Sequence, residues 1–187
     1  CAGGAPRAAP AAPWRREAYG REIDTHTALY PGGMGAVAAL KAAGYRVAIC
    51  TNKPEALAEL LLTRLGVREA FGAMLGADTL SVRKPDPEHL FETARRAGGD
   101  PAQCVLIGDT ETDRKTARAA GVPCVLVPFG PGGAAVAALE PEALLAHFAD
   151  LPEVVARLLG AAPWWPAVSP AGSPSGAAHP PRASEAG

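Results

Sequence analysis

The chain has 187 residues and a formal net charge of -1, with 48% hydrophobic and 20% charged residues. This length suits one domain with flanking segments, and the composition is that of an ordinary globular protein. The balanced charge gives no basic field that would attract nucleic acid or an anionic membrane. A membrane-spanning helix needs about 20 mostly apolar residues without breaks. The uncharged stretches of this chain are broken by prolines and glycines, so we expect no membrane-spanning helix.

The four cysteines and four histidines are scattered along the chain, and no CxxC pair occurs. This spacing argues against a zinc site or a disulfide framework. The first residues lack the charged-then-apolar layout of a secretory signal. We therefore expect a reduced, cytoplasmic setting.

Proline and glycine divide the chain into four parts. Residues 161–187 contain six prolines and three glycines, and residues 1–18 contain three prolines and two glycines. Neither end has enough apolar surface to offset the loss of chain entropy, so we expect both to be disordered. Between them we expect a short helical remnant at 19–30 and a folded core at 31–160.

Helices and strands alternate regularly in this core. Helices start at residues such as Asp86, a good N-cap, and end near glycines. The expected helices are Pro31–Ala43, Pro54–Leu65, Pro87–Ala97, Thr112–Ala120 and Pro152–Leu159, the last capped by Asp150. The expected strands are Arg46–Thr51, Ala73–Gly76, Cys104–Gly108 and Pro123–Val127.

This order predicts the α/β class with a doubly wound parallel sheet. Strands that alternate with helices of about ten residues form βαβ units. Strands whose apolar residues do not alternate belong to a parallel sheet covered on both faces. Ligands of such sheets bind beyond the carboxyl ends of the strands, where candidate functional residues are to be sought.

Two carboxylates follow the strand that ends at Gly108. Asp109 closes the strand, and Asp113 lies in the first turn of the next helix, so both can face one point. Such a pair suits Mg²⁺, which binds through few carboxylates together with phosphate and water. The alternative is a helix cap in which Arg114 or Lys115 pairs with the carboxylates.

Thr51 and Lys84 follow other strands. Thr51 ends a strand and can donate its hydroxyl to a phosphate oxygen near a helix N-terminus, or else form a local cap for the helix at Pro54. Lys84 precedes a proline and can place an ammonium on the same phosphate, or else remain solvated. A cation site, a hydroxyl and a lysine at one sheet edge describe a centre that handles phosphate, since phosphoryl transfer needs positioning and charge neutralisation.

Three motifs in fixed order resemble those of the haloacid dehalogenase superfamily. They are TNKP at Thr51–Pro54, RKPDP at Arg83–Pro87 and GDTETD at Gly108–Asp113. Further segments resemble the phosphoglycolate phosphatase subgroup of bacteria, namely LYPGG at Leu29–Gly33, GADTLSVRKPDP at Gly76–Pro87, TARAAGVP at Thr116–Pro123 and FGPGG at Phe129–Gly133. The resemblance covers about Tyr19–Leu159.

The resemblance implies a role for each matching residue. Thr51 would bind the phosphoryl group, helped by Asn52, and Lys84 would neutralise charge. Asp109 would bind Mg²⁺, and Asp113 would support that site. The implied reaction is hydrolysis of a small phosphomonoester, with 2-phosphoglycolate as the substrate of the subgroup.

The first motif of that family, a DxDGT-like segment that ends the central strand, has no match. No two aspartates are separated by one residue, and Asp24, in IDTHT, does not follow an apolar strand. We therefore assign no nucleophile and expect an incomplete, inactive copy that lacks the first central strand and most of the cap. Residues 1–18 resemble nothing in the family, and we hypothesise that they come from a wrong start or reading frame.

Two other functions compete with this interpretation. A module that binds phosphate and Mg²⁺ without catalysis would use the same residues. A dinucleotide-binding domain would need a GxGxxG after a strand, which is absent. Within the family, another small phosphomonoester remains an alternative substrate.

Overall fold

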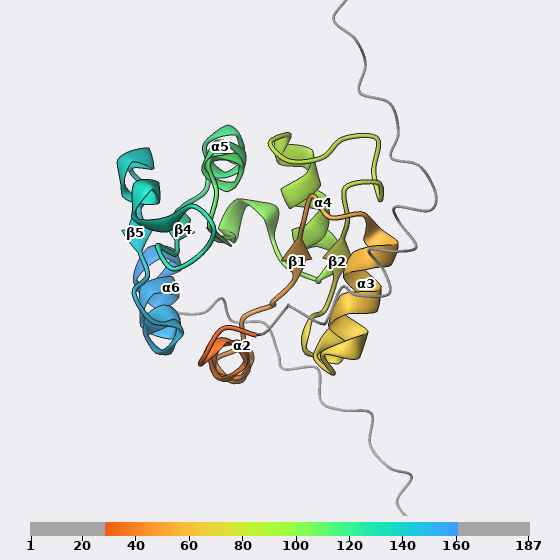
Figure 1. Ribbon diagram of the computed structural model, residues 1–187, viewed down its shortest axis with the longest axis horizontal. Coiled ribbons are helices and arrows are strands. Elements are labelled where there is room, and N and C mark those ends of the chain that lie inside the picture. Colours follow the sequence, from red (N-terminus) through yellow and green to blue (C-terminus); the bar gives the residue numbers. More distant parts are fainter. Residues whose placement is uncertain (1–28, 161–187) are drawn as a thin grey trace, which may run out of the picture.

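The structure is a computed structural model that describes residues 29–160 (Figure 1). Its helices are α2 (Gly33–Ala42), α3 (Glu55–Arg64), α4 (Pro87–Arg96), α5 (Glu111–Ala120) and α6 (Leu151–Leu159). Its strands are β1 (Ile49–Cys50), β2 (Met74–Leu75), β3 (Leu106–Gly108), β4 (Cys124–Leu126) and β5 (Ala143–Leu144). Every helix and strand expected between residues 31 and 160 is present, with shifted ends. No helix in the described range is long and apolar enough to cross a membrane.

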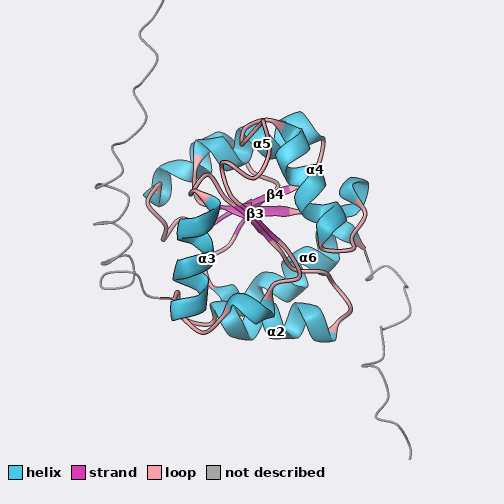
Figure 2. Cartoon of the chain, turned by 90° about the vertical axis from the view of Figure 1, so that its right-hand side faces the viewer, coloured by secondary structure: helices cyan, strands magenta, loops and turns pink. Residues whose placement is uncertain are grey.

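The strands form two separate parallel sheets. One contains β1 and β2, with Ile49 opposite Met74, and the other has the order β3-β4-β5. The α/β class with parallel strands is therefore confirmed, but within residues 29–160 β1 and β3 are not paired with each other. The family resemblance implied that the first central strand is missing, and this break in the sheet agrees with that expectation. Figure 2 shows the strands at the centre with helices around them.

The larger sheet is covered on both faces by apolar side chains. One cluster joins Leu40 of α2 and Val155 of α6 to Val125 of β4. The other joins Leu90 of α4 and Ala117 of α5 to strand residues that include Leu106 and Cys124. This two-sided cover is the doubly wound arrangement, and it explains why the strands are apolar along their whole length.

Two features differ from the sequence-based expectation. β5 was not expected; it is the outer strand of the larger sheet and pairs with β4. It is placed by Glu142, whose Oε2 accepts a hydrogen bond from the amide of Cys124 at 2.7 Å. Asp150 is the N-cap residue of α6, as expected, but its side chain makes no capping hydrogen bond, and a proline in the first turn supports the start of the helix.

Several expectations concern residues that are not described. The two terminal segments, 1–18 and 161–187, lie outside the described residues, as do residues 19–28 of the expected remnant. Cys1 is among them, whereas Cys50, Cys104 and Cys124 are described and carry free thiols.

Candidate functional site

The loop between β3 and α5 is built around the carboxylate of Asp113. Thr110 is the N-cap of α5, and its hydroxyl donates to Oδ2 of Asp113 at 2.7 Å. The same oxygen accepts from the amides of Asp109 and Thr110, each at 3.1 Å. This reciprocal capping box satisfies amides that a helix N-terminus leaves free, and it fixes the direction of the loop.

Lys84 contacts the other oxygen of that carboxylate. Its Nζ lies 2.6 Å from Oδ1 of Asp113, and the two side chains are only 11% and 5% exposed. Burial raises the pKa of Asp113, but the Lys84 ammonium and the hydrogen bonds from Thr110 and the Asp109 amide outweigh it, so the pKa is lowered overall. Lys84 is therefore a buried, paired cation rather than a solvated one.

Glycines make room for both aspartates. A Cβ on Gly108 would overlap the carboxylate of Asp113. A Cβ on Gly130 would lie 2.6 Å from Cβ of Asp109, closer than side-chain atoms approach. The loop after β4 can thus lie directly against Asp109 only because residue 130 has no side chain.

Asp109 differs from Asp113 in having an available carboxylate. Within residues 29–160, no other residue donates a hydrogen bond to its side chain. Burial, followed by the charge of Asp113, raises its pKa, although Lys84 acts in the opposite direction. A carboxylate whose negative charge is disfavoured gains from a bound cation. Asp109 thus fits Mg²⁺ as a ligand, whereas the oxygens of Asp113 already have partners.

The described residues contain no cluster of three or more His, Cys, Asp or Glu that could enclose a metal. A Mg²⁺ site does not require one, because this ion is commonly bound by one or two carboxylates, with water and phosphate as the other ligands. The donor set therefore fits Mg²⁺ held mainly by substrate and solvent, with Asp109 as its protein anchor.

Thr51 and Asn52 lie at the carboxyl end of β1. The amide of Lys53 donates to Oγ1 of Thr51 at 3.1 Å, a local turn that leaves the hydroxyl hydrogen free to donate. Nδ2 of Asn52 donates to the backbone carbonyl of Lys84 at 3.0 Å. The end of β1 is thereby connected to the Lys84–Asp113 pair. The alternative of Thr51 as a cap for the next helix is wrong, because the N-cap of α3 is Pro54 and no side chain caps it.

The alternative partners of the aspartates are engaged elsewhere. Arg114 pairs with Glu142 at 2.8 Å, and Lys115 pairs with Glu111 at 3.0 Å. Neither cation is the partner of Asp113, which is Lys84. Lys84 reaches Asp113 from another loop, the one before α4.

One buried polar residue near the site was not singled out from the sequence. His89 of α4 is fully buried, with Nε2 2.9 Å from the carbonyl of Gly76 and Nδ1 3.2 Å from Sγ of Cys50. It connects α4 to the ends of β1 and β2. The sequence offers no signal for this role, because a lone histidine on a helix is equally compatible with solvent exposure.

A family model described as haloacid dehalogenase-like hydrolase matches residues 3–121. The chain belongs to the haloacid dehalogenase-like hydrolases. This match starts ahead of Tyr19, so it includes most of the segment that the motifs left unassigned. The family's α/β fold agrees with the parallel sheets described above.

Similar proteins of known sequence or structure agree with this family. A phosphoglycolate phosphatase from Mesorhizobium japonicum is 48% identical over 134 residues, which are 71% of this chain and 59% of that protein. A crystal structure of a predicted phosphoglycolate phosphatase from Haemophilus somnus has a TM-score of 0.67 and 31% identity, over 73% of this chain and 61% of that one. CbbY from Rhodobacter sphaeroides, in complex with phosphate, has a TM-score of 0.65 and 26% identity, over 81% of this chain and 70% of that one. The chain thus spans about three fifths of the length of the first two.

Proposed function

We propose that this chain carries the phosphate-binding and Mg²⁺-binding half of a phosphomonoester hydrolase whose substrate is 2-phosphoglycolate. The observation that carries the proposal is the placement of Asp109, an available carboxylate, beside the buried Lys84–Asp113 pair at the carboxyl end of β3. The similarity to phosphoglycolate phosphatases supports the substrate, and CbbY, a structural relative in complex with phosphate, supports phosphate as a ligand.

Each residue has a definite part in binding the substrate. The hydroxyl of Thr51 and the Asn52 region bind phosphoryl oxygens near the start of α3. Lys84 has three N–H groups and uses one on Asp113, so the others can donate to phosphate. Asp109 would hold Mg²⁺, which supplies positive charge to the phosphoryl oxygens when bound.

No residue is assigned as nucleophile. An aspartyl-phosphate intermediate needs a carboxylate at the phosphorus. Asp109 is assigned to the cation and Asp113 is fully hydrogen bonded, so neither supplies it. We therefore expect the chain alone to bind phosphate and Mg²⁺ and to hydrolyse 2-phosphoglycolate far below an ordinary enzyme rate of about 1–10³ s⁻¹. The reduced, cytoplasmic setting remains part of this proposal.

Binding is tested by titrating Mg²⁺ into the chain in the presence of inorganic phosphate, followed by calorimetry. Asp109→Asn should weaken Mg²⁺ binding at least tenfold. Glu111→Gln is the matched control, since Glu111 is an exposed carboxylate two residues away that pairs with Lys115. Equal binding by both variants would show that Asp109 is not the anchor.

Catalysis is tested in a chimera. Any part of the Mesorhizobium japonicum protein that precedes its matched segment is fused ahead of Tyr19, to test whether it supplies the missing first motif. Release of phosphate from 2-phosphoglycolate by the chimera supports an incomplete phosphatase. A folded chimera that binds Mg²⁺ and phosphate without hydrolysis would instead favour the non-catalytic module.

A further inference from the structure

Helix α3 is capped from another loop. Its N-cap residue is Pro54, which has no side-chain hydrogen bond to offer. Instead, the amide of Glu55 donates to Oδ1 of Asp78 at 2.7 Å, an exposed residue 23 positions further along the chain. Asp78 lies in the segment 76–79 directly after β2, which we call the β2 loop. A helix N-terminus leaves its first amides without partners, so Asp78 satisfies one that the local sequence does not.

Further contacts hold the β2 loop against the start of α3. The amide of Ala77 donates to the carbonyl of Lys53 at 2.9 Å. The hydroxyl of Thr79 donates to Oε2 of Glu55 at 2.7 Å and accepts from the amide of Gly76 at 2.8 Å. A Cβ on Gly76 would overlap the backbone of Glu55, so the two backbones lie in direct contact. The turn before α3 therefore follows any movement of the β2 loop.

The same turn carries Thr51. The amide of Lys53, whose carbonyl accepts from Ala77, donates to Oγ1 of Thr51 at 3.1 Å. The amide of Thr51 donates to the carbonyl of Leu75, the residue before the β2 loop, at 3.0 Å. Thr51 is thus hydrogen bonded on both sides to residues that the β2 loop fixes. The position of its hydroxyl depends on that loop.

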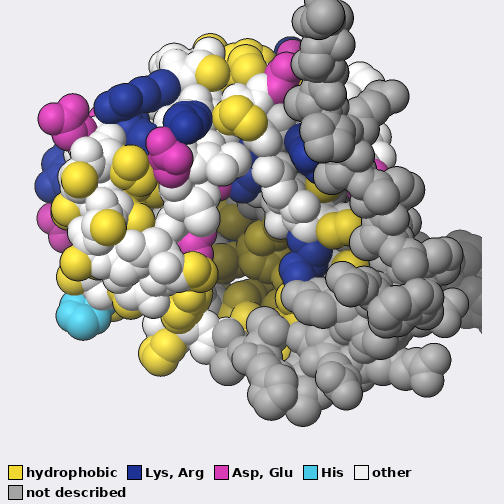
Figure 3. Space-filling model, turned by 45° about the horizontal axis from the view of Figure 1, so that its top comes forward, with side chains coloured by type: hydrophobic (Ala, Val, Ile, Leu, Met, Phe, Trp, Pro, Cys, Tyr) yellow, Lys and Arg dark blue, Asp and Glu magenta, His cyan; other side chains and the backbone are white. Residues whose placement is uncertain are grey.

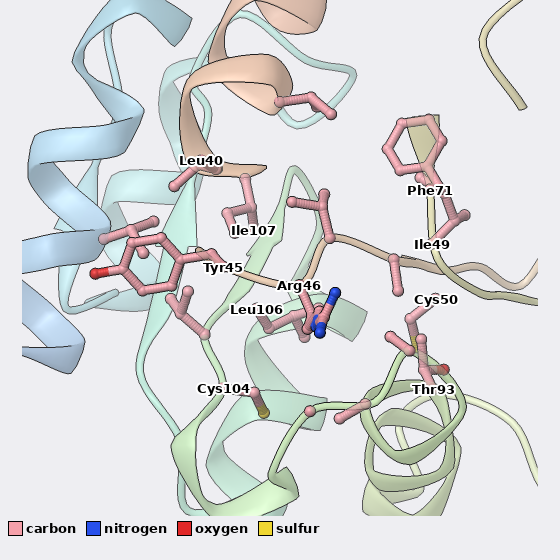
Figure 4. Close-up of a pocket in the computed structure, with 18 of the residues that line it drawn as sticks. Leu40, Tyr45, Arg46, Ile49, Cys50, Phe71, Thr93, Cys104, Leu106 and Ile107 are labelled. Atoms are coloured by element: carbon pink, nitrogen blue, oxygen red, sulfur yellow. The ribbon is translucent and has the colours of Figure 1, made fainter. Parts of the chain in front are cut away.

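The other side of β1 gives less support. Within residues 29–160, β1 has no strand there, and Ile49 and Cys50 line a cavity of about 490 Å³. Figure 4 shows both side chains at the wall of this cavity. Figure 3 shows a hollow with a hydrophobic floor that opens on one face of the protein. Because a strand with one neighbour has hydrogen bonds on one side only, the contacts with β2 and its loop determine where Thr51 lies.

We propose that Asp78 is a positioning residue for Thr51 and thereby for phosphate binding, an inference that rests on the proposed function. By capping α3 from the β2 loop, Asp78 fixes the turn that carries Thr51. The bond from Asn52 to the carbonyl of Lys84 then aligns this turn with the lysine. Asp78 does not bind the phosphate itself, because its negative charge would repel that anion. What the site requires of residue 78 is an oxygen acceptor of the right reach rather than a charge.

Two substitutions at residue 78 separate reach from charge. Asp78→Asn keeps an acceptor of the same reach and removes the charge, and asparagine caps helices as well as aspartate does. Asp78→Glu keeps the charge but lengthens the side chain. Inorganic phosphate is titrated into each full chain in the presence of Mg²⁺, followed by calorimetry. We expect Asp78→Asn to bind phosphate at least as tightly as the wild type, and Asp78→Glu and Asp78→Ala to bind it about fivefold more weakly.

Asp100→Ala is the matched control. Oδ1 of Asp100 also accepts a hydrogen bond from the amide of the second residue of a short helix, Ala102, at 2.9 Å. It precedes β3, at the amino end of the strand rather than at the site. Loss of this cap should lower the urea midpoint of unfolding and leave phosphate affinity unchanged. The control thus separates loss of position at Thr51 from a general loss of stability.

The position of Thr51 is also measured without phosphate, from the ¹³C chemical shift of its methyl group. The shift should change in Asp78→Ala and Asp78→Glu and keep its wild-type value in Asp78→Asn and Asp100→Ala. If the wild type binds no phosphate but the methyl shifts follow this pattern, the proposed function fails and the placement of Thr51 by Asp78 stands.

Three results would overturn the proposal. The first is a loss of phosphate affinity in Asp78→Asn that equals the loss in Asp78→Ala, which would assign the role to the charge. The second is wild-type affinity in Asp78→Ala or Asp78→Glu. The third is a Thr51 methyl shift that is the same in every variant. If Asp78→Ala does not fold, the comparison of Asp78→Asn with Asp78→Glu decides the matter.

Discussion

The ammonium of Lys84 lies 2.6 Å from Oδ1 of Asp113, and the two residues are 29 positions apart in the sequence. Both side chains are nearly inaccessible to solvent. The pair therefore connects the loop before α4 to the loop before α5, and with them the two halves of the fold. Because β1 and β3 share no hydrogen bonds within residues 29–160, the two sheets are joined by this contact and by the packing of Leu90 of α4 against Leu106 and Ala117.

Removal of the Lys84 charge should destabilise the protein strongly. In Lys84→Met the aliphatic part is retained, but Asp113 is left as a buried charge without a partner. We expect the free energy of unfolding in urea to fall by about 3–5 kcal/mol. The matched control is Lys115→Met, which removes an exposed helical pair and should change stability by less than about 0.5 kcal/mol. Similar losses in the two variants would contradict this prediction.

The stabilising contribution of Asp113 should disappear in acid. Its pKa in the folded protein is lowered from the ordinary 3.8, so its ionised form is favoured by folding. The contribution is fully present above the pKa that Asp113 has in the unfolded chain. It is lost as the pH falls through the lower pKa that Asp113 has in the folded protein. The stability difference between the wild type and Asp113→Asn, measured by urea unfolding, should therefore narrow below about pH 4.

Asp109 should behave in the opposite way. Its folded pKa is raised from 3.8, so its ionised form opposes folding in the absence of a cation. Asp109→Asn should unfold at a higher urea concentration than the wild type at pH 7 without Mg²⁺, and the gain should shrink as the pH approaches 4. A variant less stable than the wild type at pH 7 would show that the carboxylate stabilises the fold instead.

Gly130 should tolerate no side chain. A Cβ there would lie 2.6 Å from Cβ of Asp109, so Gly130→Ala must displace the loop and should cost about 1–3 kcal/mol. Gly35 is the control, because it lies in α2 with no atom within 4 Å of the added Cβ. Gly35→Ala should be neutral or stabilise by up to about 1 kcal/mol. Thermal unfolding of the two variants distinguishes a local clash from a general intolerance of substitution.

The chain by itself should be marginally stable and prone to aggregate. Buried backbone groups without partners cost about 1–3 kcal/mol each, and the net stability of a domain is only about 5–15 kcal/mol. The edges of β1 and β3 that have no partner strand within residues 29–160 are also templates for pairing between chains. Light scattering during heating should show aggregation before or during unfolding. A monomeric sample with a sharp two-state transition above about 50 °C would contradict this expectation.

The local sequence was sufficient to predict the order of helices and strands between residues 31 and 160, except for β5. The period of apolar residues, glycines such as Gly121 with φ 68° at the end of α5, and the cap at Asp86 depend on neighbouring residues only. The ordered motifs around Thr51, Lys84 and Asp109 likewise indicated the family before any contact was known. These signals are readable because helix capping and strand burial act over a few residues.

The roles of particular side chains were decided by tertiary structure. Asp109 and Asp113 look alike in the sequence, yet Lys84 occupies one carboxylate and leaves the other available. β5 pairs with β4, and Glu142 beside it accepts a hydrogen bond from the amide of Cys124, 18 residues earlier; neither contact can be read from the local sequence. The open edges between β1 and β3 likewise depend on which strands lie side by side. Sequence fixes local conformation through short-range forces, whereas pairing, burial and pKa shifts depend on residues that only the folded chain brings together.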